Sequence, residues 1–445
     1  MHLKQLPIFK DLTPYSGQID RDNRWIKLAE LVPWDAMDKL YRRHFDEGKQ
    51  SVIKSSRLIL GLMLGQMLLK LGDRPIVEYF HENPYFQYFC GQDTFVVKTE
   101  KSILHHSLLS KRRKRLGKAY MAQFEQEVLG VLKEKGLIKG KTLMLDATVF
   151  PAHITYPNDV KLLNTVREYL CQTILDVKNT IDPTARIRTY RKTARRLYLT
   201  FQKTRRKSRQ LIRTTRNKMI RFVRRNIDQL EQTLEQATTL KTWQKEQIKA
   251  KLSVAKDILA QQTHLATTRG RQVANRIVSF HWPQVRPLVR GKEGKTVEFG
   301  PKAHIALVDG YACLDHVQYG AFHEGNQLDT SLTHHVNRFD RQPDVVLADQ
   351  LYATRKNRAL LEEKDIDHSF RRLGRPPNDS KEERQKKQRD FKTKQGRRNH
   401  VEACFGHLKS RFNLDTITWR VPDGETMQIH LGLAAFNLQA ALAKA

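Results

Sequence analysis

Apolar positions in the first third of the chain recur with the period of an α-helix. From Leu58 to Leu71 they follow Ser56, a candidate N-cap, and Gly72-Asp73-Arg74-Pro75 then ends the helix. Further helices are predicted at 76–82, 84–90 and 102–132. With the basic run at 111–115, this helix–break–helix pattern predicts an N-terminal all-α DNA-binding domain over residues 1–135, with compact helical packing as the simpler alternative.

The rest of the chain mixes strand and helix patterns. Apolar runs predict strands at 141–150, 296–308, 312–319, 344–349 and 368–373. Helices are predicted from Asn158 or Asp159 through Leu170, at 328–338 and 354–364, around residue 402, and at 425–443. Residues 375–398 are basic and resemble a linker. Between the first two strands, two long helical stretches, near 186–225 and 227–265, predict a helical hairpin or coiled-coil arm.

Outside these two helical stretches, the order of elements is that of an α/β, RNase H-like fold. We predict an RNase H-like catalytic domain at 136–160 and 290–445, interrupted by a basic helical insertion at 161–289. In such a fold the first and fourth strands are neighbours. This arrangement would bring Asp146 and Asp349 together, although they are 203 positions apart in the sequence.

The charge balance predicts a polyanionic partner. Lys and Arg number 80 against 47 Asp and Glu, a net charge of +33 at a pI near 10.1. Residues 186–225 hold seventeen Lys or Arg and no acidic residue, which favours nucleic acid neutralising them over a merely solvated face. No run reaches the ~20 apolar residues of a spanning helix. We therefore predict DNA, and no membrane, as the partner.

The cysteines and the N-terminus predict a cytoplasmic protein. Cys90, Cys171, Cys313 and Cys404 show neither paired nor CxxC spacing, which indicates free thiols in a reducing compartment. The first residues lack the apolar core of a signal peptide. No phosphate-binding glycine loop and no nucleophile elbow is present, so ATP-driven and Ser/His/Asp chemistry are unsupported.

Three acidic residues are candidate catalytic and metal-binding residues. Asp146 and Asp349 each end or follow an apolar strand, and Glu402 lies on a predicted helix. Carboxylate oxygens are the ligands that Mg²⁺ prefers, and two such ions can activate a nucleophile and stabilise a leaving oxygen in phosphoryl transfer. We expect Asp146 to bridge two Mg²⁺ ions, with Mn²⁺ able to substitute, and Asp349 and Glu402 to bind one each.

Basic residues around these carboxylates are candidate DNA contacts. Arg398 and Lys409 share a helical face with Glu402, although an Arg–Glu pair on an exposed helix, stabilising by only ~0.3–0.5 kcal/mol, is the simpler interpretation of Arg398 alone. The other candidates are Arg112, Arg113, Arg115, Arg191, Arg195, Arg205 and Arg206. Asp159 is read as a helix cap rather than a fourth ligand, and the histidine pairs as surface or packing residues.

At these positions the chain resembles the DDE transposases of bacterial insertion sequences, within the insertion-sequence-four and -five supergroup and its five-like group. Arg398, Glu402 and Lys409 fit that group's Tyr-x2-Arg-x3-Glu-x6-Lys signature, whereas Gln395 stands at the tyrosine position. The resemblance extends to Asn23-Arg24-Trp25, to residues 82–91 and 112–116, to Asp146-Ala147-Thr148 with residues 156–164, to Phe299-Gly300-Pro301-Lys302, and to residues 348–352.

The resemblance implies a bacterial, nucleoid-associated enzyme. It would bind terminal inverted repeats of double-stranded DNA as a homodimer or larger synapse. It would then nick the DNA to free a 3′-hydroxyl that attacks target DNA. Two alternatives stay open: a non-catalytic DNA-binding relic of a transposase, and a structure-selective nuclease without strand transfer.

Overall fold

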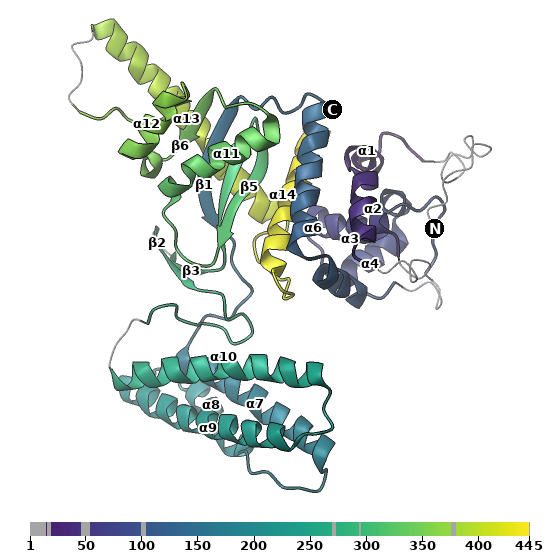
Figure 1. Ribbon diagram of the computed structural model, residues 1–445, viewed down its shortest axis with the longest axis vertical. Helices are drawn as coiled ribbons and strands as arrows, with labels where there is room; N and C mark the ends of the chain where they lie inside the picture. The colour runs from purple at the N-terminus through teal and green to yellow at the C-terminus, as the bar shows by residue number, and fades with distance from the viewer. Residues whose placement is uncertain are drawn as a thin grey trace. The chain divides into compact units, whose positions relative to one another are not determined.

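The computed structural model describes residues 15, 19–45, 54–98, 104–268, 273–292, 295–374 and 380–444. They form two compact units, one of Met1–His153 with Pro301–Ala445 and one of Ile154–Gly300. The second unit encloses the predicted insertion at 161–289. The first unit holds both the predicted N-terminal and catalytic segments, and their separation into two domains stays a prediction. The chain is a helix-rich α/β protein with one mixed sheet (Figure 1).

Helices form the N-terminal part of the first unit. They are α1 (Arg24–Leu31), α2 (Trp34–Arg42), α3 (Ser56–Leu69), α4 (Asp73–Glu82), α5 (Pro84–Phe89) and α6 (Ser107–Glu134). The N-cap of α3 is Ser55, whose side chain accepts from the backbone N–H of Leu58, so the predicted cap at Ser56 is one residue off. Gly65 lets α5 approach α3 closely, because a Cβ there would lie 2.4 Å from Phe86. Helix α3 is buried on almost every side.

The sheet of the first unit has the order β5-β4-β1-β6-β7. Its strands are β1 (Thr142–Val149), β4 (Lys302–Val308), β5 (Tyr311–Gln318), β6 (Val345–Ala348) and β7 (Asp367–His368). β1 runs antiparallel to β4 and parallel to β6, with Leu145 opposite Ala348. The predicted adjacency of the Asp146 and Asp349 strands is therefore confirmed. Asp309 and Gly310, both at positive φ, turn β4 back into β5.

Helices and short 3₁₀ turns complete the first unit. They are η4 (Glu324–Gln327), α11 (Leu328–Phe339), η5 (Gln350–Tyr352), α12 (Arg355–Glu363), α13 (Lys381–Arg411) and α14 (Gly424–Leu442). The predicted linker is wrong from residue 381 onward, where α13 begins with a capping box between Ser380 and Glu383. The first turns of α13 are exposed on all sides, so they have no apolar stripe to mark a helix.

Two strand predictions needed correction. The predicted strand at 296–308 is two strands, β3 (Lys295–Phe299) and β4, separated at Gly300-Pro301. β3 pairs with β2 (Pro287–Lys292) in a separate two-stranded sheet, whereas β4 enters the main sheet. The predicted strand at 368–373 is reduced to β7, which pairs with β6 over two residues.

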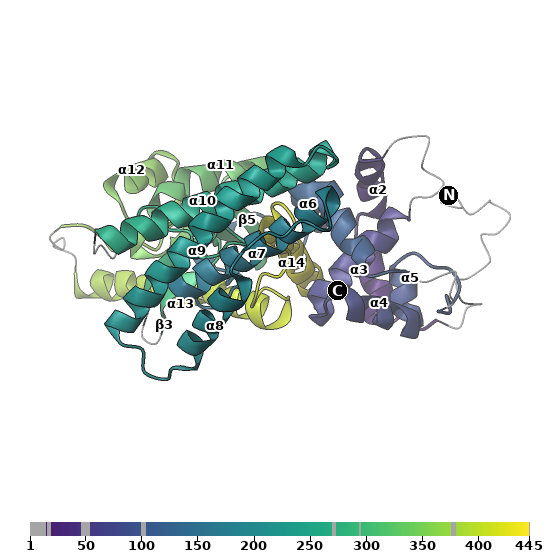
Figure 2. The same cartoon turned by 90° about the horizontal axis from the view of Figure 1, so that it is seen from below.

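In the described part of the second unit, where one helix from Asn158 or Asp159 and a two-helix arm were predicted, the β2–β3 sheet follows four helices. They are α7 (Asp159–Ile181), α8 (Arg191–Lys203), α9 (Arg209–Gln236) and α10 (Thr242–Thr267). The predicted break near residue 226 is wrong, because α9 continues through it with Asn226, Ile227 and Leu230 buried. Helices α7, α9 and α10 run alongside one another (Figure 2) around an apolar core that includes Leu163, Val223 and Ile258.

Candidate active site

Asp146 and Asp349 lie on neighbouring parallel strands. Asp146 lies in the second half of β1, and Asp349 follows the last residue of β6 directly. Each carboxylate accepts from the next backbone N–H, Asp146 from Ala147 at 2.8 Å and Asp349 from Gln350 at 2.6 Å. Because β1 and β6 run in the same direction, the two carboxylates emerge near one end of the strand pair.

Helix α13 brings the third acidic residue to β1. Along β1 the helix makes three contacts: Arg397 Nη2 donates to Thr142 Oγ1 at 3.0 Å, Arg398 Nη1 forms an ion pair with Asp146 Oδ2 at 3.7 Å, and Lys409 Nζ donates to Thr148 Oγ1 at 2.9 Å. Arg398 Nη2 also lies 3.2 Å from Glu402 Oε1. A single guanidinium therefore links the strand carboxylate to the helix carboxylate.

The Asp146 carboxyl is held in an environment that disfavours its charge. Its pKa rises to about 6, chiefly because the side chain is buried, and also because Glu324 and Asp349 place negative charge nearby. Arg398 and the Ala147 N–H oppose this rise. A divalent cation beside Asp146 would remove the same penalty, so the charge distribution fits a cation-binding role.

The chemistry of the three acidic side chains suits a divalent metal, but their positions do not yet form a complete set of ligands. The donors are hard carboxylate oxygens, which suit Mg²⁺ or Mn²⁺. Within the described ranges, however, no three Asp, Glu, His or Cys residues are gathered closely enough to form a ligand group. Glu402, with 57% of its side chain exposed, turns toward Arg398. A metal held by all three predicted ligands would therefore require Arg398 to leave its position between the carboxylates.

Glu324 is an acidic residue near the site that the sequence analysis missed. It lies at the start of η4, with only 13% of its side chain exposed, and Lys302 Nζ of β4 pairs with its Oε1 at 2.8 Å. The available signal was an acidic residue beside Gly325 in the connection after the hairpin. The sequence around Glu324 does not show that Asp349, 25 positions further along the chain, lies near it.

Gly325 and Asn357 fix η4 against η5. A Cβ at Gly325 would lie 2.5 Å from the carbonyl oxygen of Leu351, so only glycine fits this approach. The buried Asn357 amide donates to the carbonyls of Gly325 at 2.7 Å and Tyr352 at 2.8 Å. The segments that hold Glu324 and Asp349 are therefore tied together.

The predicted DNA contacts on α6 differ in their surroundings. Arg113 is 4% exposed; its guanidinium pairs with Asp73 at 2.5 Å and lies over the Trp419 ring. This side chain is committed to the interior, so predicting it as a DNA contact was a mistake. Arg112 and Arg115 both stack on Phe45, and Arg115 is exposed. For these two, DNA contact stays a prediction.

Four of the other predicted DNA contacts are exposed, whereas Asp159, predicted as a helix cap, is not the N-cap of α7. Arg191 and Arg195 are exposed on α8, and Arg205 and Arg206 are exposed between α8 and α9. Asn158 caps α7, while Asp159 in its first turn pairs with Arg276 at 2.8 Å.

Gln395, at the signature's tyrosine position, donates to the Ser369 carbonyl at 2.9 Å. Its amide therefore fastens α13 to the backbone that follows β7. All four cysteines are free, as predicted, and the structure shows that they are also buried.

Two parts of the chain match transposase families. Residues 346–439 match the family described as a transposase DDE domain, and residues 14–115 match the one described as a transposase domain (DUF772). The DDE match includes Asp349 and Glu402, whereas Asp146 lies before it. These matches support a DDE transposase, a class of DNA-cleaving and strand-transferring enzymes that generally use divalent metal ions.

One curated relative is similar over part of the chain. It is the uncharacterized protein ORF8 in the nfe locus of Rhizobium meliloti, 26% identical over 140 residues. The match covers 31% of this chain and 66% of that protein, just under two thirds of its length. No solved structure matches the chain. Within the described ranges, no helix is long and apolar enough to cross a membrane.

Proposed function

We propose that this protein is a transposase of the insertion-sequence-four and -five supergroup with an RNase H-like catalytic core. It binds the terminal inverted repeats of its element and catalyses metal-dependent strand cleavage and strand transfer. The observation that carries this proposal is the shared location of three residues distant in sequence. Asp146 on β1, Asp349 after β6 and Glu402 on α13 are held on elements that contact one another.

The order of elements supports the RNase H-like assignment. A hairpin, β4 with β5, flanks β1 on one side, and the parallel strands β6 and β7 flank it on the other. The helical unit at residues 154–300 leaves the chain after β1 and returns before β4. An insertion at this place leaves the β1–β6 pairing, and with it the two aspartates, undisturbed.

The carboxylates are proposed to hold two Mg²⁺ ions, for which Mn²⁺ can substitute. Bound there, the ions would activate the attacking water or 3′-hydroxyl and stabilise the leaving oxygen. Asp146, Asp349 and Glu402 would hold the ions through their carboxylate oxygens. Released from the carboxylates, Arg398 would bind a DNA phosphate, and Lys409 would bind another along the same helix face.

The basic surface of the second unit is proposed to bind the DNA backbone. Arg191, Arg195, Arg205 and Arg206 are exposed cations on one segment of sequence without an acidic residue. Arginine contacts to phosphates position a duplex without reading its sequence. The active form is proposed to be a homodimer or larger synapse that holds two element ends.

Cleavage and joining of labelled DNA that carries the element's inverted repeats test this proposal. Wild type and Glu402→Gln are compared with Mg²⁺ and with EDTA, and DNA binding is measured in parallel. We expect end cleavage and a joined product only for wild type with Mg²⁺, while Glu402→Gln still binds the repeats.

Other outcomes would identify the alternatives. Tight repeat binding without cleavage by wild type would indicate a DNA-binding relic. Cleavage without end specificity and without a joined product would indicate a structure-selective nuclease.

A further inference from the structure

The first half of α9, residues 209–225, has a surface that differs from the rest of the helix. Its polar side chains are neutral or cationic, whereas Asp228, Glu231 and Glu235 follow in the second half. A groove of about 600 Å³ runs along the first half and is lined by α9 residues between 209 and 221. A merely solvated helix face usually carries charges of both signs, as α10 does, so this surface suits a polyanion.

Two amide side chains lie near the centre of this groove. Gln210 and Asn217 are seven positions apart, and at 3.6 residues per turn they fall within about 20° of each other around the helix axis. By the same geometry, Arg209 and Arg213 lie on one side of them and Lys218 lies on the other. The groove therefore has two neutral amides near its centre and cations on both sides.

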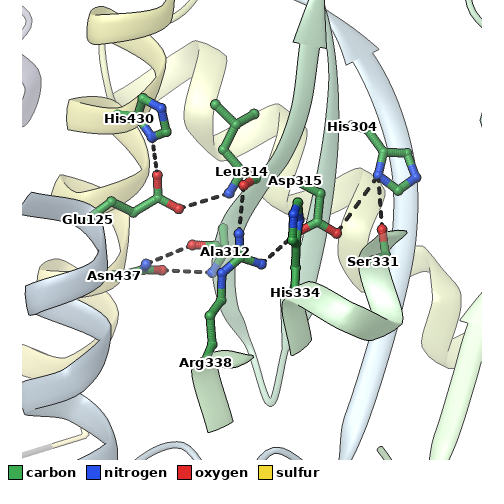
Figure 3. A network of polar contacts seen from close by, with 10 residues as sticks. All are labelled: Glu125, His304, Ala312, Leu314, Asp315, Ser331, His334, Arg338, His430 and Asn437. Atoms are coloured by element: carbon green, nitrogen blue, oxygen red, sulfur yellow. Dashed lines mark hydrogen bonds and ion pairs between the residues drawn. The ribbon is translucent and has the colours of Figure 1, made fainter. Parts of the chain in front are cut away.

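Amides that serve the fold are recognised by their partners. Figure 3 shows Asn437 of α14 donating to the Ala312 carbonyl at 2.8 Å and accepting from the Ala312 N–H at 2.7 Å. By contrast, Gln210 and Asn217 form no side-chain hydrogen bond in the part of the chain that the structure describes, and Asn217 Oδ1 is shielded from solvent without a donor. A shielded amide oxygen that lacks a donor is unfavourable, so a ligand that supplies one is favoured.

The start of α9 is accessible to a large ligand. Residues 208–210 and 212–214 are all exposed, and the first buried residue of α9 is Thr215. Arg205 and Arg206, which lie just before the helix, are exposed as well. An α-helix with its side chains is about 10–12 Å across, which fits the major groove of B-DNA, about 12 Å wide.

From this arrangement we propose that the first half of α9 enters the major groove of the element's terminal repeat and reads its sequence. Gln210 and Asn217 contact base edges, and the cations on either side bind phosphates. Gln and Asn side chains pair best with adenine, through its N7 acceptor and N6 donor. Seven helical positions span about 10 Å, which places the two adenines about three base pairs apart. The inference rests on the proposed binding of terminal repeats, and it adds sequence readout to the backbone binding proposed for this unit.

The test is fluorescence anisotropy of the full chain on two labelled duplexes of equal length and composition. One duplex carries the terminal repeat and the other a scrambled sequence. We expect Gln210→Ala and Asn217→Ala each to reduce the preference for the repeat about 5- to 150-fold, because each removes one base contact. Affinity for the scrambled duplex and its salt dependence should stay at their wild-type values. An unchanged preference in either variant would overturn the proposal.

Variants of the flanking cations should show the opposite signature. Arg209→Gln and Arg213→Gln each remove a phosphate contact, so both duplexes should be bound more weakly and to the same extent. The slope of log affinity against log salt should flatten by about 0.9 in each variant. A reduced preference with an unchanged slope in these variants would contradict the assignment of bases to the centre of the groove and phosphates to its sides.

Gln232→Ala is the matched control. Gln232 is exposed on the same helix, but it lies in the acidic half, next to Glu231. All three Ala variants replace a helical amide by the strongest helix former, so circular dichroism and the thermal midpoint should stay close to wild type. We expect Gln232→Ala to bind both duplexes like wild type. A loss of preference equal to that of the other two variants would overturn the proposal.

Single replacements of adenine by 7-deazaadenine in the repeat locate the bases that are read. This analogue still pairs with thymine but lacks the N7 acceptor in the major groove. Binding by wild type should weaken at two adenines about three base pairs apart. Gln210→Ala should be insensitive to the replacement at one of them, and Asn217→Ala at the other. Wild-type sensitivity of both variants at every adenine would overturn the proposal.

The same binding data separate this inference from the function on which it rests. Wild type that binds the repeat no more tightly than the scrambled duplex would overturn both. A wild-type preference that survives in Gln210→Ala and in Asn217→Ala would overturn only the role of α9.

Discussion

Arg398 Nη1 lies 3.7 Å from Asp146 Oδ2, so a cation of the protein itself occupies the side of this carboxylate that faces α13. The same guanidinium reaches Glu402, whose side chain is largely exposed. Arg398 therefore contacts two of the three predicted ligands, and it is the side chain that a metal bound to them would have to displace.

Replacing Arg398 by Ala is expected to affect DNA far more than folding. The pair with the exposed Glu402 contributes ~0.2–1 kcal/mol, and the largely buried Asp146 also loses its counter-charge, so the free energy of unfolding should fall by about 1–2 kcal/mol. The slope of log affinity for duplex DNA against log salt should flatten by about 0.9, since one phosphate is no longer bound. Urea unfolding and fluorescence anisotropy measure the two effects. An unchanged salt slope with a large loss of stability would assign Arg398 a structural role only.

The pKa of Asp146 predicts how stability depends on pH in EDTA. The carboxyl titrates near pH 6 when folded and near 3.8 when unfolded. Between these values the folded state binds more protons, so stability falls as pH rises from about 4 to 6 and the loss persists above 6. Because Asn carries no charge, the free energy of unfolding of Asp146→Asn should rise relative to that of wild type over this pH range, by on the order of 2 kcal/mol.

The measurement is urea unfolding of both proteins at pH 4.5, 5.5 and 7, first in EDTA and then with excess Mg²⁺. Mg²⁺ at pH 7 should stabilise wild type and leave Asp146→Asn nearly unchanged. A difference between the two proteins that is constant across pH would mean that Asp146 has an ordinary pKa.

The strands β1 and β6 could be predicted from the sequence because each is marked by its own apolar run. Apolar runs ending in Asp146 and Asp349 have the length of buried strands, and their neighbourhood follows from the order of elements. Glu324 could not be recognised in this way. Its surroundings depend on the approach of η4 to η5, which is a packing relationship between distant segments. Arg113 was misread because a run of basic residues does not reveal which one faces Asp73.

Arg113→Ala is expected to destabilise the protein without a specific effect on DNA. Its removal leaves Asp73 without its counter-charge, with Gln66 as its remaining side-chain donor, and exposes the Trp419 ring, which should lower the free energy of unfolding by about 2–4 kcal/mol. Lys114, next to it and exposed, is the control, and its replacement by Ala should change stability by less than ~0.5 kcal/mol. A stable Arg113→Ala protein with weakened DNA binding would return this residue to the DNA surface.

Neutralising the basic surface of the second unit should weaken DNA binding in proportion to the number of phosphates that this surface binds. We compare a variant with Gln at Arg191, Arg195, Arg205 and Arg206 with a control carrying Gln at Lys241 and Lys249, which are exposed in the same unit. If all four arginines bind phosphates, the log–log salt slope should flatten by about 3.6. The control slope should hardly change. An unchanged slope in the arginine variant would remove this surface from the DNA interface.

Because η4 lies close to η5, replacing glycine by alanine should have different effects on stability at Gly325 and at Gly320, both in the segment after β5. A Cβ at Gly325 would meet the Leu351 carbonyl oxygen at 2.5 Å, whereas at Gly320 the nearest atom is the Gln318 amide nitrogen at 3.8 Å. Gly325→Ala must therefore separate η4 from η5, strain the Asn357 hydrogen bonds and move Glu324 away from Asp146. We expect a loss of about 1–3 kcal/mol in unfolding free energy for Gly325→Ala. Gly320→Ala should stay within about 0.5 kcal/mol of wild type.

The displacement of Glu324 also has a signature at the site. Because Glu324 contributes to the raised pKa of Asp146, moving it away should lower that pKa. The test compares the unfolding free energy with and without Asp146→Asn in each glycine variant. The pH-dependent part of that difference should be smaller in Gly325→Ala than in wild type, and it should keep its wild-type size in Gly320→Ala. If Gly325→Ala leaves both stability and this difference unchanged, then η4 and η5 are not held as closely as the contact between Gly325 and Leu351 requires.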